Sequence, residues 1–260
     1  MFQFIHKWLN RRIIQRSTTT STQWATAYSS LPLLQGLTAH EKHRLQELAI
    51  LFLHHKVFEG ASGLEVTSGM KLIIALQACL PVLKLGLGGY EGWLTVIVYP
   101  AGFSPKRVIR DEYGVEHHVQ SNLSGEAWQR GPVVLSWDET KCAGVIDGHN
   151  LVIHEFAHKL DMQNGDANGY PPLHKGMNST AWAEALSAGL EDLQHKCNRG
   201  KGIGINCYAA SSPAEYFAVL SEVFFERPNL IQYHYAAVYE QLCQYYRQDP
   251  LTRLRNKKNK

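Results

Sequence analysis

The sequence contains the segment His154-Glu155-Phe156-Ala157-His158 within an apolar stretch. This is the H-E-x-x-H pattern, in which two histidines four residues apart lie on one face of a helix and can bind one metal ion. Zinc lowers the pKa of a bound water toward neutrality, and a carboxylate beside that water can take its proton as the water attacks a peptide carbonyl. We therefore predict His154 and His158 as zinc ligands and Glu155 as the general base of peptide hydrolysis.

The flanking residues place this motif in a helix. Asn150 is a suitable N-cap before Leu151, and neither Pro nor Gly follows until Gly165. The alternative is a buried helix whose two histidines make only hydrogen bonds in the core and bind no metal.

A catalytic zinc site usually has three protein ligands, so the motif needs a further residue. A third histidine does not follow closely, because the next one is His174 in a proline-rich loop. Glu215 and Glu222 are the better candidates, since they lie seven residues apart and therefore on one face of a later helix. Ser212 with Glu215 also fits a capping box, which would give Glu215 only a structural role. Spacing alone does not choose between the two glutamates.

Asp161 is a candidate for a supporting role, three residues after His158. Its carboxylate could accept a hydrogen bond from the second ring nitrogen of a ligand histidine, which would orient that imidazole. It could equally cap the end of the helix or bind the loop that follows. The sequence leaves both interpretations open.

Helical spacing of apolar residues recurs over much of the chain. Thr38 and Glu41 form a capping box at the start of the first of these helices, and Pro81 should end or kink the second. The predicted helices outside the motif cover residues 39–56, 69–85, 180–197, 213–226 and 229–247.

Strand signals occur before the motif. Two runs rich in β-branched residues lie at 94–99 and 133–137, next to prolines. The polar segment 101–130 between them favours short hairpins around Gly114. Strands followed mainly by helices indicate an α+β fold, with a small sheet and a mostly helical C-terminal half.

Composition and charge limit the class of protein. The chain has 260 residues, of which 45% are hydrophobic, and a formal net charge of +3, which allows a well-buried core in one catalytic domain. Much of the positive excess lies at the two ends, so the near-neutral middle gives no indication of a nucleic-acid-binding face. The apolar stretch 72–87 is interrupted by Pro81 and Lys84 and is too short for a transmembrane segment.

The N-terminal region differs from the rest because residues 1–40 contain no Asp or Glu and begin with an amphipathic stretch. A membrane-surface or transit-like segment is one interpretation, but a mobile extension is favoured, and no continuous apolar region indicates a secretory signal. The predicted divisions are a flexible basic extension over 1–23, a single zinc metallopeptidase domain over 24–250 with a helical annex at 24–90 and a catalytic core at 91–250, and a basic tail over 251–260.

The five cysteines are an odd number and show no C-x-x-C spacing. They do not form the dense framework that is typical of small secreted domains. We therefore expect reduced thiols in a cytoplasmic protein.

Several segments between Trp24 and Pro250 resemble one known family, the family of Mlc titration factor A. The segments that carry the resemblance are Leu31-Pro32-Leu33-Leu34, Cys79-Leu80-Pro81-Val82-Leu83, Gly131-Pro132-Val133-Val134-Leu135, the motif with Lys159-Leu160-Asp161, and the stretch from Tyr208 to Glu222. The first twenty or so residues depart from the family and look like an added extension.

The resemblance implies a cytoplasmic bacterial zinc peptidase with a gluzincin-type site, a zincin-like fold and a core related to lethal-factor-type peptidase domains. It further implies His154, His158 and Glu215 as ligands of one Zn²⁺, Glu155 as the base and Tyr208 as a hydroxyl that stabilises the transition state. The family also binds the glucose repressor Mlc, so a peptide substrate and this repressor are the expected partners.

Two functions are compatible with these features. The first is a peptidase, and the second is a non-catalytic protein that titrates the repressor and holds a structural zinc. A structural zinc has four protein ligands, whereas a glutamate beside the two histidines favours hydrolysis. Neither substrate preference nor the choice between exopeptidase, such as an aminopeptidase, and endopeptidase follows from the sequence.

Overall fold

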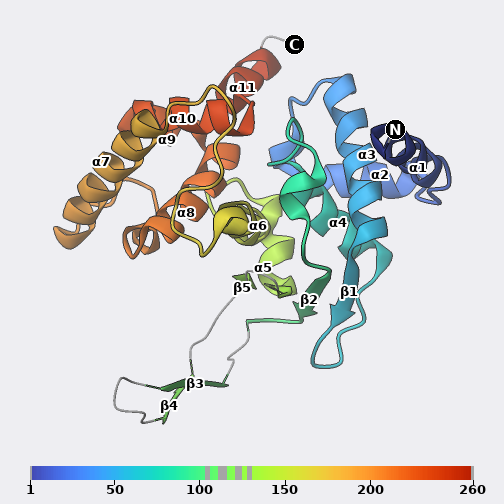
Figure 1. Ribbon diagram of the computed structural model, residues 1–260, viewed down its shortest axis with the longest axis horizontal. Coiled ribbons are helices and arrows are strands. Elements are labelled where there is room, and N and C mark those ends of the chain that lie inside the picture. The colour runs from blue at the N-terminus through green and yellow to red at the C-terminus, as the bar shows by residue number, and fades with distance from the viewer. Residues whose placement is uncertain (1, 103–105, 111–115, 121–124, 128–130, 259–260) are drawn as a thin grey trace.

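The computed structural model describes residues 2–102, 106–110, 116–120, 125–127 and 131–258 (Figure 1). Its longer helices in chain order are α1 (Phe2–Gln15), α2 (Ser21–Ser29), α3 (Ala39–His55), α4 (Ser68–Cys79), α5 (Trp137–Thr140), α6 (Leu151–Asp161), α7 (Ser179–Asn198), α8 (Pro213–Glu226), α9 (Pro228–His234), α10 (Ala236–Tyr246) and α11 (Pro250–Lys258). The strands are β1 (Val57–Gly60), β2 (Thr95–Tyr99), β3 (Lys106–Arg110), β4 (Glu116–Gln120), β5 (Gly125–Ala127) and β6 (Val133–Ser136). The α+β class predicted from the sequence is confirmed.

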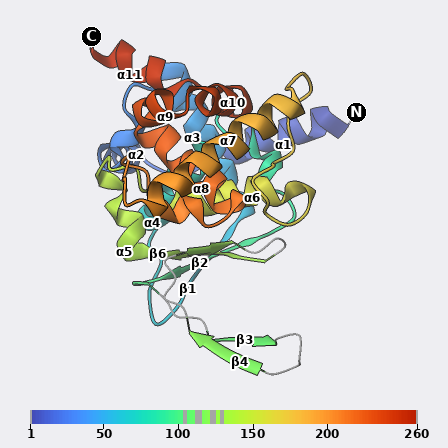
Figure 2. The same ribbon diagram turned by 90° about the vertical axis from the view of Figure 1, so that its left-hand side faces the viewer.

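The sheet contains four strands in the order β1-β2-β6-β5. Strands β1, β2 and β6 run parallel, and β5 pairs with β6 in the antiparallel direction at one edge. Val96, Val98 and Leu135 are fully buried, as expected for strands that pack against helices. Figure 2 shows the helices gathered on one side of this sheet.

A second pair of strands stands apart from the sheet. Strands β3 and β4 pair antiparallel, with Lys106 opposite Gln120 and Arg110 opposite Glu116 (Figure 1). This agrees with the hairpin expected between the two sheet strands. The turn expected at Gly114 lies outside the described residues.

Most predicted helices are present, with bounds set by their caps. Thr38 caps α3 as a full capping box with Glu41. Helix α4 ends at Cys79, before Pro81, because proline lacks the N–H that would continue the helix. Strand β1 was not predicted, since Val57–Gly60 is a short stretch directly after α3.

The prediction of one helix over 229–247 is wrong. The chain forms α9 and α10 instead, and Tyr235 between them has the non-helical angles φ −141° and ψ 61°. The predicted basic tail over 251–260 is helical as far as Lys258, because α11 spans Pro250–Lys258. Among the described helices, none combines the length and the apolar character needed to cross a bilayer.

Helix α6 is anchored in the core by the aromatic residue at the centre of its motif. Phe156 is fully buried, and its ring centroid lies 5.5 Å from that of Phe52, 5.0 Å from that of Tyr90 and 5.7 Å from that of Trp93. These edge-on and tilted contacts are favourable for aromatic pairs. Because residues two apart on a helix face different ways, this packing leaves the two histidines on another side of α6.

Candidate metal centre

Helix α6 presents both histidines of the motif to the same point. Asn150 caps the helix, and its side-chain oxygen accepts a hydrogen bond from the backbone N–H of Ile153 at 3.0 Å. The Nε2 atoms of His154 and His158 lie 3.2 Å apart, and both side chains are about nine-tenths buried. The predicted helix and its cap are confirmed, and the two imidazoles converge as the spacing requires.

Helix α8 brings a third group to this point. Ser212 caps α8 by accepting a hydrogen bond from the N–H of Glu215 at 3.2 Å. The Glu215 carboxylate itself faces the histidines, with Oε2 3.0 Å from His154 Nε2 and 3.4 Å from His158 Nε2. Glu215 therefore occupies a capping position and also contributes its side chain to the site.

The three side chains fit a metal ion. One potential ligand atom from each of His154, His158 and Glu215 lies within 4.8 Å of the other two. Tetrahedral zinc with bonds near 2.1 Å holds its ligand atoms about 3.4 Å apart, which matches these separations. Glu215 Oε2 is buried and makes no hydrogen bond of suitable geometry to any described residue. A buried acceptor without such a bond, next to two imidazole nitrogens, is the environment that a cation would satisfy.

The charges of the three groups reinforce one another. Burial tends to raise the pKa of Glu215, but the two histidines outweigh it and hold that pKa well below its usual range. Burial likewise opposes a charge on His154, yet Glu215 and Glu222 raise the pKa of this histidine to about 10. The site thus strongly favours a cation beside its carboxylates.

Glu155 is almost fully buried beside these groups, at 4% exposure. Burial raises its pKa to about 7, and the nearby His154 and His158 partly oppose this rise. Its Oε2 atom has no hydrogen-bond partner among the described residues. A carboxyl with a pKa near neutrality is suited to both accepting and returning a proton.

Glu222 contacts the opposite edge of the His154 ring. Its Oε1 lies 2.7 Å from His154 Nδ1, and its Oε2 accepts the backbone N–H of Asn150 at 2.5 Å. A carboxylate on Nδ1 fixes the tautomer, so that the lone pair of Nε2 faces the centre. The two glutamates that spacing left equivalent therefore occupy different places. Glu215 faces the centre and Glu222 supports His154 from behind.

A network that sequence reasoning missed surrounds Glu222. His149 Nδ1 lies 3.0 Å from Glu222 Oε2, which raises the pKa of this histidine to about 9 against the opposing effect of burial. The Asn150 side chain donates to Gln77 Oε1 at 2.9 Å and to Glu226 Oε1 at 3.1 Å. These partners come from α4 and α8, far apart in sequence, so no local spacing could have indicated them.

Asp161 binds the loop that follows α6. Its Oδ2 accepts the N–H groups of Asn168 and Gly169 at 2.8 and 2.7 Å, which agrees with one of its two predicted roles. Gly169 has φ +76°, and a Cβ there would clash with the carbonyl oxygen of Pro213 at the start of α8. The loop thus contacts both helices of the site.

Tyr208 reaches the site from the short helix η5 (Cys207–Ala210). Its ring centroid lies 6.2 Å from that of His154, and the residue is 53% exposed. Partial burial and the nearby Glu215 raise the pKa of its hydroxyl to about 12, so it stays protonated as a donor. The structure thus places this residue beside the histidines.

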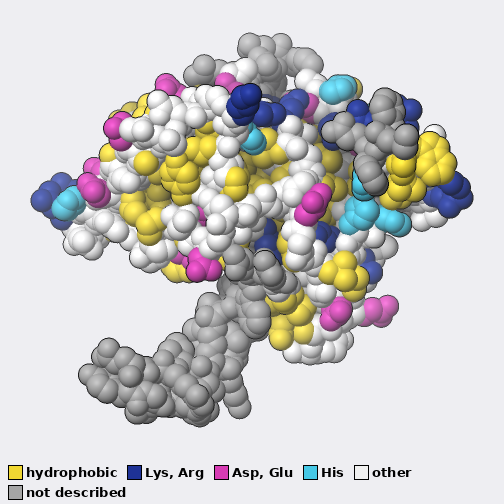
Figure 3. Space-filling view, in the orientation of Figure 1, with side chains coloured by type: hydrophobic (Ala, Val, Ile, Leu, Met, Phe, Trp, Pro, Cys, Tyr) yellow, Lys and Arg dark blue, Asp and Glu magenta, His cyan; other side chains and the backbone are white. Residues whose placement is uncertain are grey.

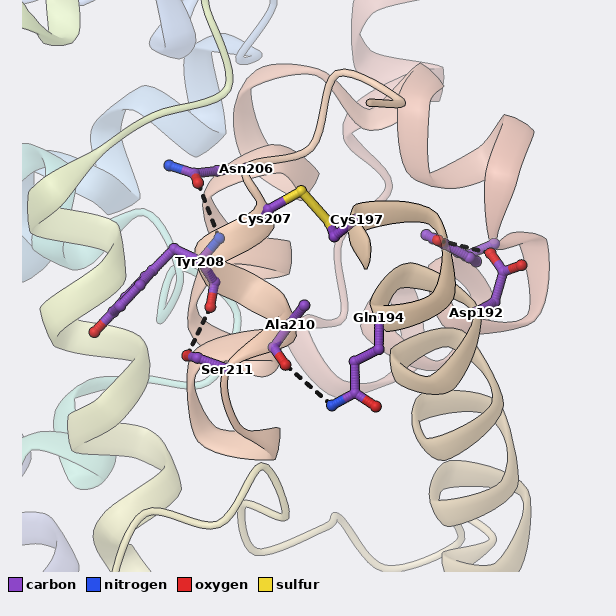
Figure 4. The surroundings of a disulfide bond; sticks show 9 residues. Asp192, Gln194, Cys197, Asn206, Cys207, Tyr208, Ala210 and Ser211 are labelled. Carbon is purple, nitrogen blue, oxygen red and sulfur yellow. Dashed lines mark hydrogen bonds between the residues drawn. A yellow bond between two sulfur atoms is a disulfide. The ribbon is translucent and has the colours of Figure 1, made fainter. Parts of the chain in front are cut away.

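The prediction that all cysteines are reduced is wrong. Cys197 at the end of α7 and Cys207 at the start of η5 form a disulfide (Figure 4). In Figure 4 the Tyr208 ring extends away from this bond. Within the described part of the chain, the other three cysteines are free thiols: Cys79, Cys142 and Cys243. The pair escaped prediction because the spacing of ten residues matches no common motif.

Comparison with known proteins agrees with the geometry. Residues 5–247 match the family described as glucose-regulated metallo-peptidase M90, so the match begins well before Trp24. Proteins named Mlc titration factor A from Yersinia pestis (strain Pestoides F) and Yersinia pseudotuberculosis serotype O:1b (strain IP 31758) are each 41% identical over 241 residues. Each alignment covers 91% of this chain and 88% of the relative. The chain therefore belongs to the glucose-regulated metallopeptidase M90 family.

Proposed function

We propose that this chain is a zinc-dependent peptidase. The observation that carries the proposal is the convergence of His154, His158 and Glu215 on one point, with Glu155 buried beside them. Three ligands leave one position open in a four-coordinate site, which is the arrangement of catalytic rather than structural zinc.

Each side chain has a defined task in this proposal. When bound, zinc would acidify a water molecule and polarise the carbonyl of the substrate. Glu155 would serve as the general base that accepts a proton from water and returns it to the leaving amine, because its pKa of about 7 suits both roles near neutral pH. The Tyr208 hydroxyl donates a hydrogen bond to the oxygen on which negative charge develops. Glu222 keeps His154 in one tautomer throughout.

The decisive experiment measures zinc content and peptide hydrolysis on the same purified sample. One zinc per chain with hydrolysis that stops on chelation and returns with zinc would support the proposal. Glu155→Gln should retain zinc and lose about 10²–10⁴-fold in turnover, because the amide keeps the size but not the basicity of the carboxylate. Glu184→Gln, an exposed residue on α7, is the matched control and should change neither quantity.

The relatives' name supports a further part of the proposal. We propose that the chain also binds the glucose repressor Mlc and acts in the cytoplasm. If binding and hydrolysis are separate functions, Glu155→Gln should still bind the repressor with full affinity. Full zinc occupancy and repressor binding without any hydrolysis would favour the alternative of a non-catalytic titrating protein. Comparing free and N-acetylated peptides would test aminopeptidase action.

A further inference from the structure

The link between α7 and Tyr208 is held by the Cys197–Cys207 disulfide. Cys207 directly precedes Tyr208, so the bond fixes the backbone next to the tyrosine to the end of a long helix. The intervening residues include Gly200, Gly202 and Gly204, two of which have positive φ. Without the disulfide, a glycine-rich segment of this kind would restrain η5 only weakly relative to the end of α7. We infer that the disulfide positions Tyr208, and that its reduction lowers turnover; this rests on the proposed function.

Hydrogen bonds around η5 limit how far the segment can loosen when the disulfide is reduced. The side chain of Gln194 donates to the carbonyl of Ala210 at 3.0 Å, and Asn206 accepts the N–H of Tyr208 at 3.0 Å (Figure 4). These bonds hold η5 in its local shape without the disulfide. The Tyr208 ring is half exposed and lies against the His154 ring on one side only, so its position depends largely on its backbone. Reduction should therefore loosen the tyrosine without unfolding the site.

The disulfide is open to chemical reduction because Cys207 is exposed and Cys197 is half-buried. A dithiol attacks one sulfur through its thiolate, and its second thiol then releases the mixed disulfide. Two electrons and two protons pass to the cysteines, and the dithiol becomes a disulfide. Cytoplasmic disulfides are usually transient and redox-sensing, so this bond would couple activity to the thiol balance of the cell.

The test compares the oxidised enzyme with enzyme reduced by dithiothreitol and then freed of it. We expect kcat to fall about tenfold with KM and zinc content unchanged, because Tyr208 acts only in the transition state. The double variant Cys197→Ser with Cys207→Ser should have the lower kcat and no response to reduction. Cys142→Ser, at an exposed free thiol, should respond like the wild type.

Equal kcat values for the oxidised and reduced enzymes would overturn the inference, as would zinc loss accounting for the whole change. Amide hydrogen exchange of residues 206–211 gives a readout that needs no hydrolysis. It should increase on reduction while exchange in α6 stays constant. If the protein hydrolyses no peptide in either state, the proposed function fails, and the exchange data still decide whether the disulfide restrains Tyr208.

A second, independent observation concerns the outer face of α1. Ile5, Trp8 and Leu9 are 50%, 54% and 43% exposed and lie within about one turn of each other. Ile13 and Ile14 are half-buried toward α3, and Leu9 lies at the border of this contact. Figure 3 shows hydrophobic side chains beside Lys and Arg side chains at the edge where Figure 1 places α1. The helix therefore has an apolar stripe, Ile5, Trp8 and Leu9, that the described protein covers only in part.

The charged residues of the helix itself, Lys7, Arg11 and Arg12, are all basic. Lys7, Arg11 and Arg12 are exposed on α1, Arg16 is exposed directly after it, and the first acidic residue of the chain is Glu41. The Arg12 guanidinium lies 4.7 Å from the Trp8 ring centroid, which joins a basic group to the apolar stripe. Apolar anchors with basic flanks suit a bilayer surface, whereas a nucleic acid would need only the charges.

We propose that α1 docks on an anionic lipid surface, with Trp8 and Leu9 at the level of the headgroups. The full chain should sediment with vesicles of roughly two parts phosphatidylcholine to one part phosphatidylglycerol, and not with phosphatidylcholine alone. Arg11→Glu with Arg12→Glu should weaken this binding at least about tenfold, and so should Trp8→Ser with Leu9→Ser. Leu94→Ser, at an exposed apolar residue elsewhere, should bind like the wild type.

Circular dichroism of each variant would show whether α1 and the fold are retained. Binding that survives both double variants would overturn the proposal, and so would equal binding to neutral vesicles. Tight binding to duplex DNA that depends on Arg11 and Arg12 but not on Trp8 would also overturn it, in favour of a nucleic-acid contact.

Discussion

The two regions that build the site are held in place in different ways. The α6–α8 pair carries His154, His158 and Glu215 on buried helices with side-chain caps. The α7–η5 region carries Tyr208 on a single exposed turn that a disulfide holds. The first arrangement preorganises the candidate metal-binding side chains by burying them, and the second fixes the exposed tyrosine mainly through its backbone. The regions should therefore respond differently to substitution.

The largest effect is expected in the helix pair. His154→Ala removes one of three ligands, so zinc affinity should fall by more than about 100-fold and hydrolysis should reach background. Metal analysis after dialysis, together with peptide hydrolysis, checks this outcome. Full zinc occupancy in His154→Ala would show that the motif is not the metal centre.

Substitution in the second region should spare the metal. Tyr208→Phe should lower kcat by about 10²–10³-fold with unchanged zinc content, because it removes one donor to the developing oxyanion. Steady-state kinetics and metal analysis on one preparation provide the measurement. Tyr233→Phe, at an 82% exposed tyrosine on α9, serves as control. A loss of zinc in Tyr208→Phe would place the tyrosine among the metal-holding groups instead.

A smaller effect separates the two glutamates of α8. Glu222→Gln should weaken zinc binding about 10–100-fold through the orientation of His154, and Glu215→Gln should weaken it further. Competition with a zinc chelator measures both affinities. Glu226→Gln is a useful control, because its carboxylate binds Gly148 and Asn150 rather than a histidine. The reverse order of the first two variants would make Glu222 the ligand.

The smallest effect concerns His149 at the edge of the helix pair. Its contact with Glu222 raises its pKa from 6.5 to about 9, so the folded state binds the proton more tightly than the unfolded state does. The resulting stability is complete below about pH 6.5 and is lost as the pH rises through about 9. His149→Asn should therefore lower the free energy of unfolding most near pH 6, by less than about 1 kcal/mol because the side chain is half exposed.

Thermal unfolding of the wild type and His149→Asn at several pH values tests this expectation. The two melting curves should approach each other above about pH 9. A difference that grows with pH would contradict the charged contact and indicate a neutral hydrogen bond.

The helices α6 and α8 were largely predictable from the sequence. Caps, apolar periodicity and the H-E-x-x-H spacing are local features, so α6 and α8 have nearly the predicted bounds. The choice between Glu215 and Glu222 depended on family resemblance at the sequence level. In the structure it depends on the rotation of α8, which sets one carboxylate at the centre and the other behind His154.

The rest could not be predicted because it depends on contacts between distant segments. Strand β1 is too short to show a pattern and gains its identity from parallel pairing with β2. The Cys197–Cys207 bond requires the turn that returns η5 to α7. The support of Glu222 by His149 likewise appears only when α8 lies against the start of α6.

One glycine lies in the narrow gap between the two helices of the candidate metal centre. The backbone N–H of Gly169 donates a hydrogen bond to the Asp161 carboxylate at the end of α6. Gly169 also lies against Pro213 at the start of α8, with no room for a side chain. At this point, therefore, only the backbone of Gly169 fits between the end of α6 and the start of α8. A side chain there would clash with the backbone of Pro213, two residues before Glu215, so α6 and α8 could not keep their present approach. A loop that contains none of the candidate ligands therefore constrains the spacing between the two helices that carry them.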